Sequence, residues 1–132
     1  MNRTILFRGK ALENGRWKRG SLLLTDPIVD RGEAFIIYEN FKYEVDRSSV
    51  GQFLTTIDGK EAFEGDFIET GYEGLFEEGR CIGLLEWRHD GAMLDFGSQS
   101  IPLEASCFDA DKIIVGNMTD NPEMWDKCGR QV

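Results

Sequence analysis

The stretch GKEAFEGDFIE, Gly59–Glu69, holds the pattern from which the fold can be worked out. Asp58-Gly59, at its start, is a turn signal. The residues that follow alternate as a short extended segment, and Gly65 then permits a bend or a β-bulge. We expect Asp66 to cap or bridge the turn that starts the next strand. The stretch therefore predicts a joint between two β units, built mainly from structural residues.

Two carboxylates in this stretch raise the alternative of a functional site. Glu64 and Asp66 are two residues apart, so in a regular strand they would share a face and would need a cation or a metal ion between them. Gly65 favours a bend that directs them apart, and hence a structural turn rather than a catalytic or metal role. Asp109 and Asp111 could also hold a cation, although this spacing before a strand is more typical of a solvated turn.

The rest of the chain consists of short strand patterns between turn signals. Strands are expected over residues 4–8, 16–24, 34–38, 41–45, 80–87, 92–96, 100–103 and 112–115. Asn14-Gly15 predicts a tight hairpin turn between the first two, because both residues accept positive φ. Pro102 marks its strand as an edge or an irregular segment. Residues 70–79, with three Gly and three Glu, predict a mobile loop or a boundary between two small β subdomains.

Helical signals are few and short. Residues 46–51 predict one helical turn, with Asp46 as N-cap and Gly51 as C-terminal stop. Asn121 and Pro122 predict the start of a C-terminal helix that carries Met124 and Trp125. The fold class is therefore mainly β: a small β-barrel-like domain of short antiparallel strands with one or two short helices.

The length of 132 residues predicts a single domain over residues 1–132. A subdivision into N-terminal hairpins, residues 1–64, and a C-terminal barrel-like unit, residues 65–132, is the alternative. Hydrophobic content of 41% and charged content of 30% are typical of a globular chain. The apolar runs are too short to span a bilayer, and the first ten residues lack the apolar segment of a signal peptide, so we expect a cytoplasmic protein with no membrane partner.

The net charge of −9 is unevenly distributed. Residues 1–24 hold six Lys/Arg against one acid, whereas residues 67–132 hold five Lys/Arg against thirteen acids. The basic start could pair with the acidic end, within one chain or between copies. The acidic half would repel a phosphate backbone, which makes nucleic acid the less favoured partner.

Cofactor and metal motifs are missing from the sequence. Cys81, Cys107 and Cys128 form no C-x-x-C pair, and His89 is the single histidine, so neither a zinc site nor a triad is indicated. No glycine-rich phosphate loop occurs. We therefore predict no catalytic, cofactor-binding or metal residues.

One candidate interaction surface remains. Trp17 stands among three cations, Arg16, Lys18 and Arg19. Such a set can anchor a protein interface or can stack on bases while it neutralises phosphates. It can also be a half-buried tryptophan with solvated cations beside it.

Five segments in order resemble the YopX family, small bacterial proteins carried mostly by prophages. They are ILFRGK, NGRWKRGSL, VDRSSVGQF, GKEAFEGDFIE and IIVGNMTDNPE, and the resemblance runs from Ile5 to Glu123. Arg47 stands where the family usually has Pro. The resemblance implies a β-rich, oligomeric protein of phage or prophage origin with no established activity, so it assigns no catalytic residue.

These observations favour a non-enzymatic binding or accessory protein that acts as a homo-oligomer, with a host or phage protein as a further partner. A nucleic-acid-binding protein that uses the Arg16–Arg19 surface is the first alternative. An enzyme with an acidic metal site near Glu64, Asp66 or Asp109 is the second.

Overall fold

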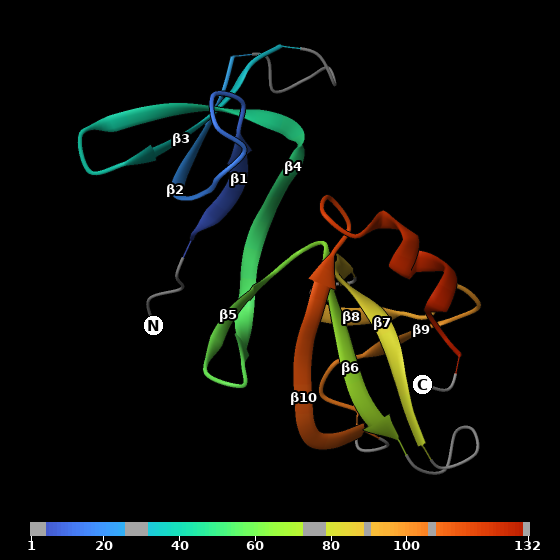
Figure 1. The fold of residues 1–132 in the computed structure, drawn as a ribbon. Helices are drawn as coiled ribbons and strands as arrows, with labels where there is room; N and C mark the ends of the chain where they lie inside the picture. The colour runs from blue at the N-terminus through green and yellow to red at the C-terminus, as the bar shows by residue number, and fades with distance from the viewer. Residues whose placement is uncertain (1–4, 26–31, 73–78, 89–90, 106–107, 131–132) are drawn as a thin grey trace. The chain divides into compact units, whose positions relative to one another are not determined.

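The computed structural model describes residues 5–25, 32–72, 79–88, 91–105 and 108–130. Within these ranges the chain forms ten strands and one 3-10 helix, so the predicted mainly β fold is confirmed (Figure 1). The chain divides into two compact units, Met1–Phe53 and Leu54–Val132.

Unit 1 is built from strands that close on themselves. Its strands are β1 (Phe7–Ala11), β2 (Trp17–Leu24), β3 (Ala34–Tyr38) and the first part of β4 (Phe41–Ile57). Consecutive strands pair in antiparallel fashion, and β1 also pairs with β4, which closes the four strands into a small barrel. This closure leaves few free strand edges.

The inside of this barrel is filled by alternate residues of each strand. Ala34, Ile36 and Val45 are buried at its centre, and Phe7 and Leu22 pack against them. The strand period of two residues sends the intervening side chains to the outer face. Gly9 lies inside as well, where an added Cβ would lie 2.7 Å from a Val45 methyl group, so the small residue permits close packing of β1.

The predicted helical turn at residues 46–51 is wrong, because these residues belong to β4. Here the pairing of β1 with β4 shifts register, and four residues of β4 stand opposite Gly9 alone. The Ser49 hydroxyl donates to the Asp46 carbonyl (2.5 Å) and accepts from the Lys10 N–H (2.8 Å). The polar residues that resemble a helix cap therefore satisfy the backbone of a β-bulge.

Unit 2 contains a five-stranded antiparallel sheet in the order β10-β6-β7-β8-β9. Its strands are β6 (Asp66–Tyr72), β7 (Gly79–Arg88), β8 (Gly91–Asp95), β9 (Ser100–Pro102) and β10 (Phe108–Asn117). β9 lies at one edge, as the proline predicts. The end of β4 is joined by a hairpin to β5 (Lys60–Phe63), which pairs with it.

Both faces of the unit 2 sheet are apolar. Ile68, Leu85 and Leu94 belong to the larger core cluster, whereas Phe67 and Leu84, their sequence neighbours, belong to a second cluster on the other face. Because neighbours in a strand point to opposite faces, adjacent apolar pairs predict a sheet that is covered on both sides.

The second face is covered by the C-terminal segment. The expected helix is the 3-10 helix η1 (Pro122–Lys127), near the red end of the chain (Figure 1). Its Met124 and Trp125 pack on this cluster. Asn121 makes no side-chain cap bond. Its side-chain oxygen instead accepts from the N–H of Asn117, the last residue of β10, at 3.2 Å.

The turn residues adopt the following geometry. Gly15 has φ of 69°, whereas Asn14 does not have positive φ and instead accepts from the Arg16 N–H through its side chain (3.0 Å). Asp58 and Gly59 both have positive φ, 51° and 73°. The prediction of two positive φ values thus fails at Asn14-Gly15, where the loop is longer than a two-residue turn.

Candidate binding surface

The structure separates the residues of the sequence-predicted surface. Arg16 is exposed in the turn before β2, and Trp17 and Arg19 lie two apart on the outer face of that strand. Lys18 points to the opposite face, where its ammonium lies 4.4 Å from the centre of the Tyr43 ring. Sequence neighbours in a strand cannot share a face, so the four residues do not form one surface.

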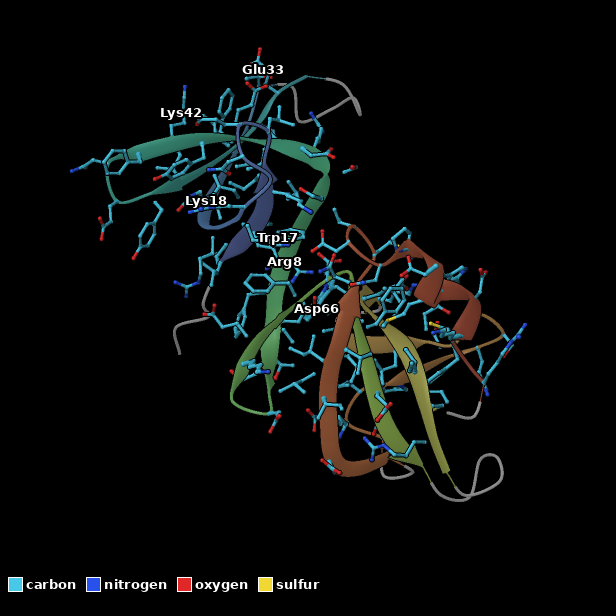
Figure 2. The ribbon with its side chains drawn as sticks, viewed as in Figure 1. Arg8, Trp17, Lys18, Glu33, Lys42 and Asp66 are labelled. Carbon is cyan, nitrogen blue, oxygen red and sulfur yellow. The ribbon has the colours of Figure 1, made fainter. Side chains whose placement is uncertain are left out.

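Strand pairing brings two other cations to Trp17. Lys10 is the register partner of Trp17, and Arg8 is the partner of Arg19. The Arg8 guanidinium carbon lies 4.6 Å from the Trp17 ring centre and the Lys10 ammonium lies 5.9 Å from it (Figure 2). We call Arg8, Lys10, Trp17 and Arg19 the cationic outer face.

This face was missed by sequence reasoning, although a signal was present. Arg8 and Lys10 alternate with the small residue Gly9, and the hairpin at Asn14-Gly15 sets them opposite β2. Counting back through a two-residue turn would have placed Arg8 and Lys10 on the same face as Trp17, although with Lys10 opposite Arg19 rather than opposite Trp17.

The cationic outer face has a defined geometry because its cations rest on an aromatic ring. A cation over an indole is stabilised by about 0.5–1 kcal/mol at an exposed site. A further cation–ring contact lies on the neighbouring strands, where the Lys42 ammonium is 4.5 Å from the centre of the Phe35 ring. The outer side of unit 1 can therefore attract anionic groups while the apolar part of Trp17 contacts them.

The two carboxylates of the β5–β6 joint, Asp66 and Glu64, differ in burial. Asp66 is 2% exposed, and its Oδ2 accepts from the Phe63 N–H at 2.8 Å. Gly65, with φ of 96°, donates to the Leu85 carbonyl (3.0 Å) and accepts from the Met118 N–H (2.8 Å). Glu64 is only half-buried beside them. Asp66 and Gly65 thus hold backbone segments together.

Glu86, on β7, lies beside Arg88 and has a clearly shifted pKa. Arg88 Nη2 lies 2.7 Å from Glu86 Oε2 and 3.3 Å from Asp95 Oδ2. Burial, then the charges of Asp95 and Glu64, raise the pKa of Glu86, while Arg88 lowers it. Arg88 is thus shared between two carboxylates, Glu86 and Asp95, and offsets only part of the rise in the pKa of Glu86.

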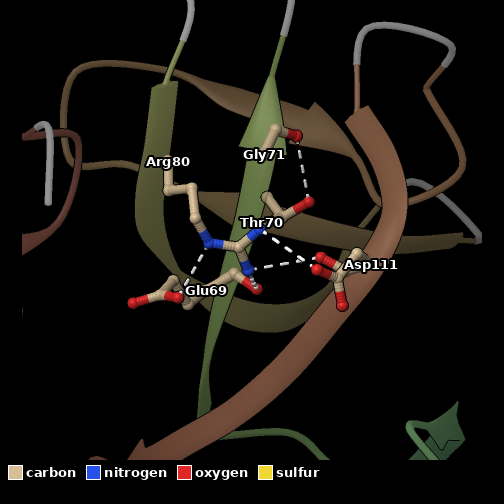
Figure 3. A network of polar contacts seen from close by, with 5 residues as sticks. All are labelled: Glu69, Thr70, Gly71, Arg80 and Asp111. Carbon is tan, nitrogen blue, oxygen red and sulfur yellow. Dashed lines mark hydrogen bonds and ion pairs between the residues drawn. The ribbon is translucent and has the colours of Figure 1, made fainter.

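A second guanidinium holds the other end of the sheet together (Figure 3). Arg80 Nε lies 2.9 Å from Glu69 Oε2, and its terminal nitrogens contact the Asp111 carboxylate (3.5 Å) and carbonyl (3.3 Å). Asp111, a predicted cation ligand, is thus paired with an arginine.

Among the residues that the structure describes, no group of three His, Cys, Asp or Glu side chains is arranged to hold a metal ion. His89 and Cys107 lie outside the described residues, and the side chain of Asp109 is likewise not described. Cys81 is buried, and burial followed by the charges of Asp95 and Cys81 raises the pKa of Cys128 to about 11. A thiol with this pKa stays protonated at neutral pH.

No protein-family model and no curated protein matches the sequence. A crystal structure does match: protein YopX from Bacillus subtilis aligns over 95% of this chain and 97% of its own, with 13% identity and a TM-score of 0.54. The chain has a YopX-like fold. The YopX-like fold expected from the five sequence segments is therefore confirmed at the level of structure.

Within the described ranges, no helix has the length and apolar character needed to cross a bilayer.

Proposed function

We propose that this protein is a non-enzymatic binding protein that acts as a homo-oligomer. In this proposal the cationic outer face of one copy docks on the acidic second unit of another. The observation that carries the proposal is the division of charge between the compact units. Residues 1–53 hold nine Lys/Arg and seven Asp/Glu, a net of +2, and residues 54–132 hold six Lys/Arg and seventeen Asp/Glu, a net of −11.

Complementary charge raises the rate of encounter and selects the partner, while an apolar anchor supplies the affinity. The cationic outer face offers both, because Trp17 is surrounded by Arg8, Lys10 and Arg19. Trp and Arg are the residues most enriched at the centres of protein interfaces. Every copy of the protein carries the acidic second unit, so each copy can serve as the anionic partner of another.

Light scattering of the full chain at about 10 mM and about 1 M salt tests this proposal, because the Debye length falls from about 30 Å to about 3 Å. We expect a larger mass at low salt than at high salt. Arg19→Glu should reduce the low-salt mass, whereas Arg16→Glu, an equal charge change in the turn, should reduce it less. A monomer at every salt concentration would remove the proposal.

Nucleic acid is the second candidate partner of the cationic outer face. Trp17 among arginine and lysine side chains favours it, since such sets stack on bases. The net charge of −11 on residues 54–132 opposes it. Gel-shift titration with single- and double-stranded DNA at low salt separates the two, and absence of a shift would end this alternative.

An enzyme with an acidic metal site is the remaining alternative. The Asp66 carboxylate accepts a hydrogen bond from the Phe63 N–H, and the Asp111 carboxylate forms an ion pair with Arg80, which argues for structural roles. A thermal-shift screen against divalent ions tests it, because an ion that binds the folded state raises Tm. The phage or prophage origin and the cytoplasmic location stay part of the proposal.

A further inference from the structure

The barrel of unit 1 has a notch at one end of β4. β1 pairs with β4 only as far as Ala11 opposite Val45. One further bond follows, from the Leu12 N–H to the Glu44 carbonyl (3.0 Å), and the chain then turns away toward β2. On its other side β4 is paired with β3 as far as Phe41. Within the described part of unit 1, β4 therefore has a neighbour on one side only before Glu44.

The direction of the backbone groups follows from these pairs. The Glu44 carbonyl points toward β1, and a residue two positions away in a strand points its backbone groups the same way. The N–H and C=O of Lys42 are thus directed to the open side, whereas Tyr43 faces β3. Such an unpaired edge is a template for another strand.

A hollow of about 410 Å³ lies along this edge. It is lined by Ala11, Leu12, Glu13, Lys42, Tyr43 and Glu44. Two large apolar side chains at the notch are exposed, Leu12 by 59% and Phe41 by 61%. Leu12 lines the hollow, and Phe41 directly precedes Lys42 on the open edge, so both exposed side chains can be covered by another chain.

We infer that this edge of β4 binds an extended segment of a different protein by β-augmentation. The segment pairs its backbone with Lys42 and sets alternate apolar side chains against Phe41 and Tyr43, whose rings lie on one face of β4 with their centres 6.2 Å apart. Charge defines the remaining positions: an acid beside the Lys42 ammonium and a base beside Glu13 and Glu44, since opposite charges on paired strands attract. This site is separate from the cationic outer face and does not depend on the proposed function.

A second copy of this chain does not fit the same edge. Two-fold antiparallel pairing centred on Lys42 would set the two lysines opposite each other, which is destabilising. Pairing centred on Tyr43 would require the Glu44 carbonyl, which already accepts from Leu12. The edge therefore suits a strand of another sequence.

Binding of a synthetic peptide to the full chain tests the inference. The probe is a labelled peptide of about nine residues in which valine alternates with threonine, with one threonine replaced by aspartate and the next by lysine. Fluorescence anisotropy measures its affinity, and the amide signal of Lys42 in a nitrogen–proton correlation spectrum reports the place of binding. The same peptide with every backbone amide N-methylated is the control, because it keeps the side chains but cannot donate.

Lys42→Pro removes the N–H from the open edge without removing a bond to β3, and Lys42→Gln is the matched variant that keeps it. We expect Lys42→Pro and N-methylation each to weaken binding about tenfold or more, and Lys42→Gln to weaken it by no more than about fivefold, because it loses only the charge pair with the peptide's aspartate. No binding to the wild type, or equal binding by Lys42→Pro or by the methylated peptide, would overturn the inference. Self-association that Lys42→Pro abolishes would overturn it as well, in favour of a second copy as occupant.

Discussion

The joint between β5 and β6 depends on one buried carboxylate. Asp66 is 2% exposed and accepts from the Phe63 N–H at 2.8 Å. Asp66→Ala leaves this buried N–H without its acceptor, which costs about 1–3 kcal/mol. Since the acceptor is a carboxylate, we expect the free energy of unfolding to fall by about 2–3 kcal/mol.

Two neighbouring substitutions calibrate this effect. Gly65 has φ of 96°, a region that L side chains rarely adopt, so Gly65→Val should cost about 1–3 kcal/mol. Glu64 is half-buried on the same turn, and Glu64→Gln should change stability by no more than about 0.5 kcal/mol. The joint is structural if stability falls only for Asp66 and Gly65.

Urea unfolding, followed by tryptophan fluorescence and by circular dichroism, measures these differences. The comparison requires that the slope of the free energy against urea stay unchanged. A loss of about 2–3 kcal/mol also corresponds to a fall in Tm of roughly 10–20 °C for a unit of this size. If Asp66→Ala and Gly65→Val left stability unchanged while Glu64→Gln abolished a measured binding, the structural role of the joint would be refuted.

Three more substitutions test the packing and the electrostatics. Gly20→Ala should lower the Tm of unit 1 sharply, because the new Cβ would clash with the Ile37 carbonyl oxygen. An unchanged Tm would contradict the close approach of β2 to β3. The pKa of Glu86 is raised in the folded protein, so its protonated form contributes stability below the ordinary value of 4.5, and this stability is lost as pH rises from 4.5 through the folded pKa. Glu86→Gln should therefore flatten the decline of the unfolding free energy over that pH interval. Equal declines for the variant and the wild type in parallel urea titrations would argue against this role. Arg80→Gln should cost only about 1 kcal/mol, because the Glu69 pair is partly solvated, and a loss above about 3 kcal/mol would show that it acts as a buried pair.

Much of the secondary structure could be predicted from local patterns. The strand at residues 34–38 has the predicted bounds, since a run of apolar and aromatic residues between turn signals has few alternatives. The C-terminal helix begins at Pro122 as predicted. Residues 46–51 show the limit: Asp and Ser side chains satisfy backbone groups equally well in a helix cap and in a β-bulge, and only pairing with β1 decides between them.

The candidate surface shows a second limit. The run of residues 16–19 is basic and aromatic in sequence, yet Lys18 lies on the opposite face from Trp17. Arg8 and Lys10 reach Trp17 only because the hairpin register sets them across from β2. The loop of this hairpin is longer than the two-residue turn that Asn14-Gly15 predicts, so the register that sets Lys10 opposite Trp17 could not be counted from the sequence.

By itself, the sequence determined that this chain forms short strands and turns, and it determined how charge is divided along its length. Both are properties of single residues and their near neighbours, which set the local backbone preferences and the net charge. The closure of β1 onto β4, the grouping of Arg8 with Trp17 and the open edge at Lys42 came from the tertiary structure alone. These features arise where strands of unequal length pair, because each backbone group must find a partner across space and the side chains are then carried to whichever face that pairing requires.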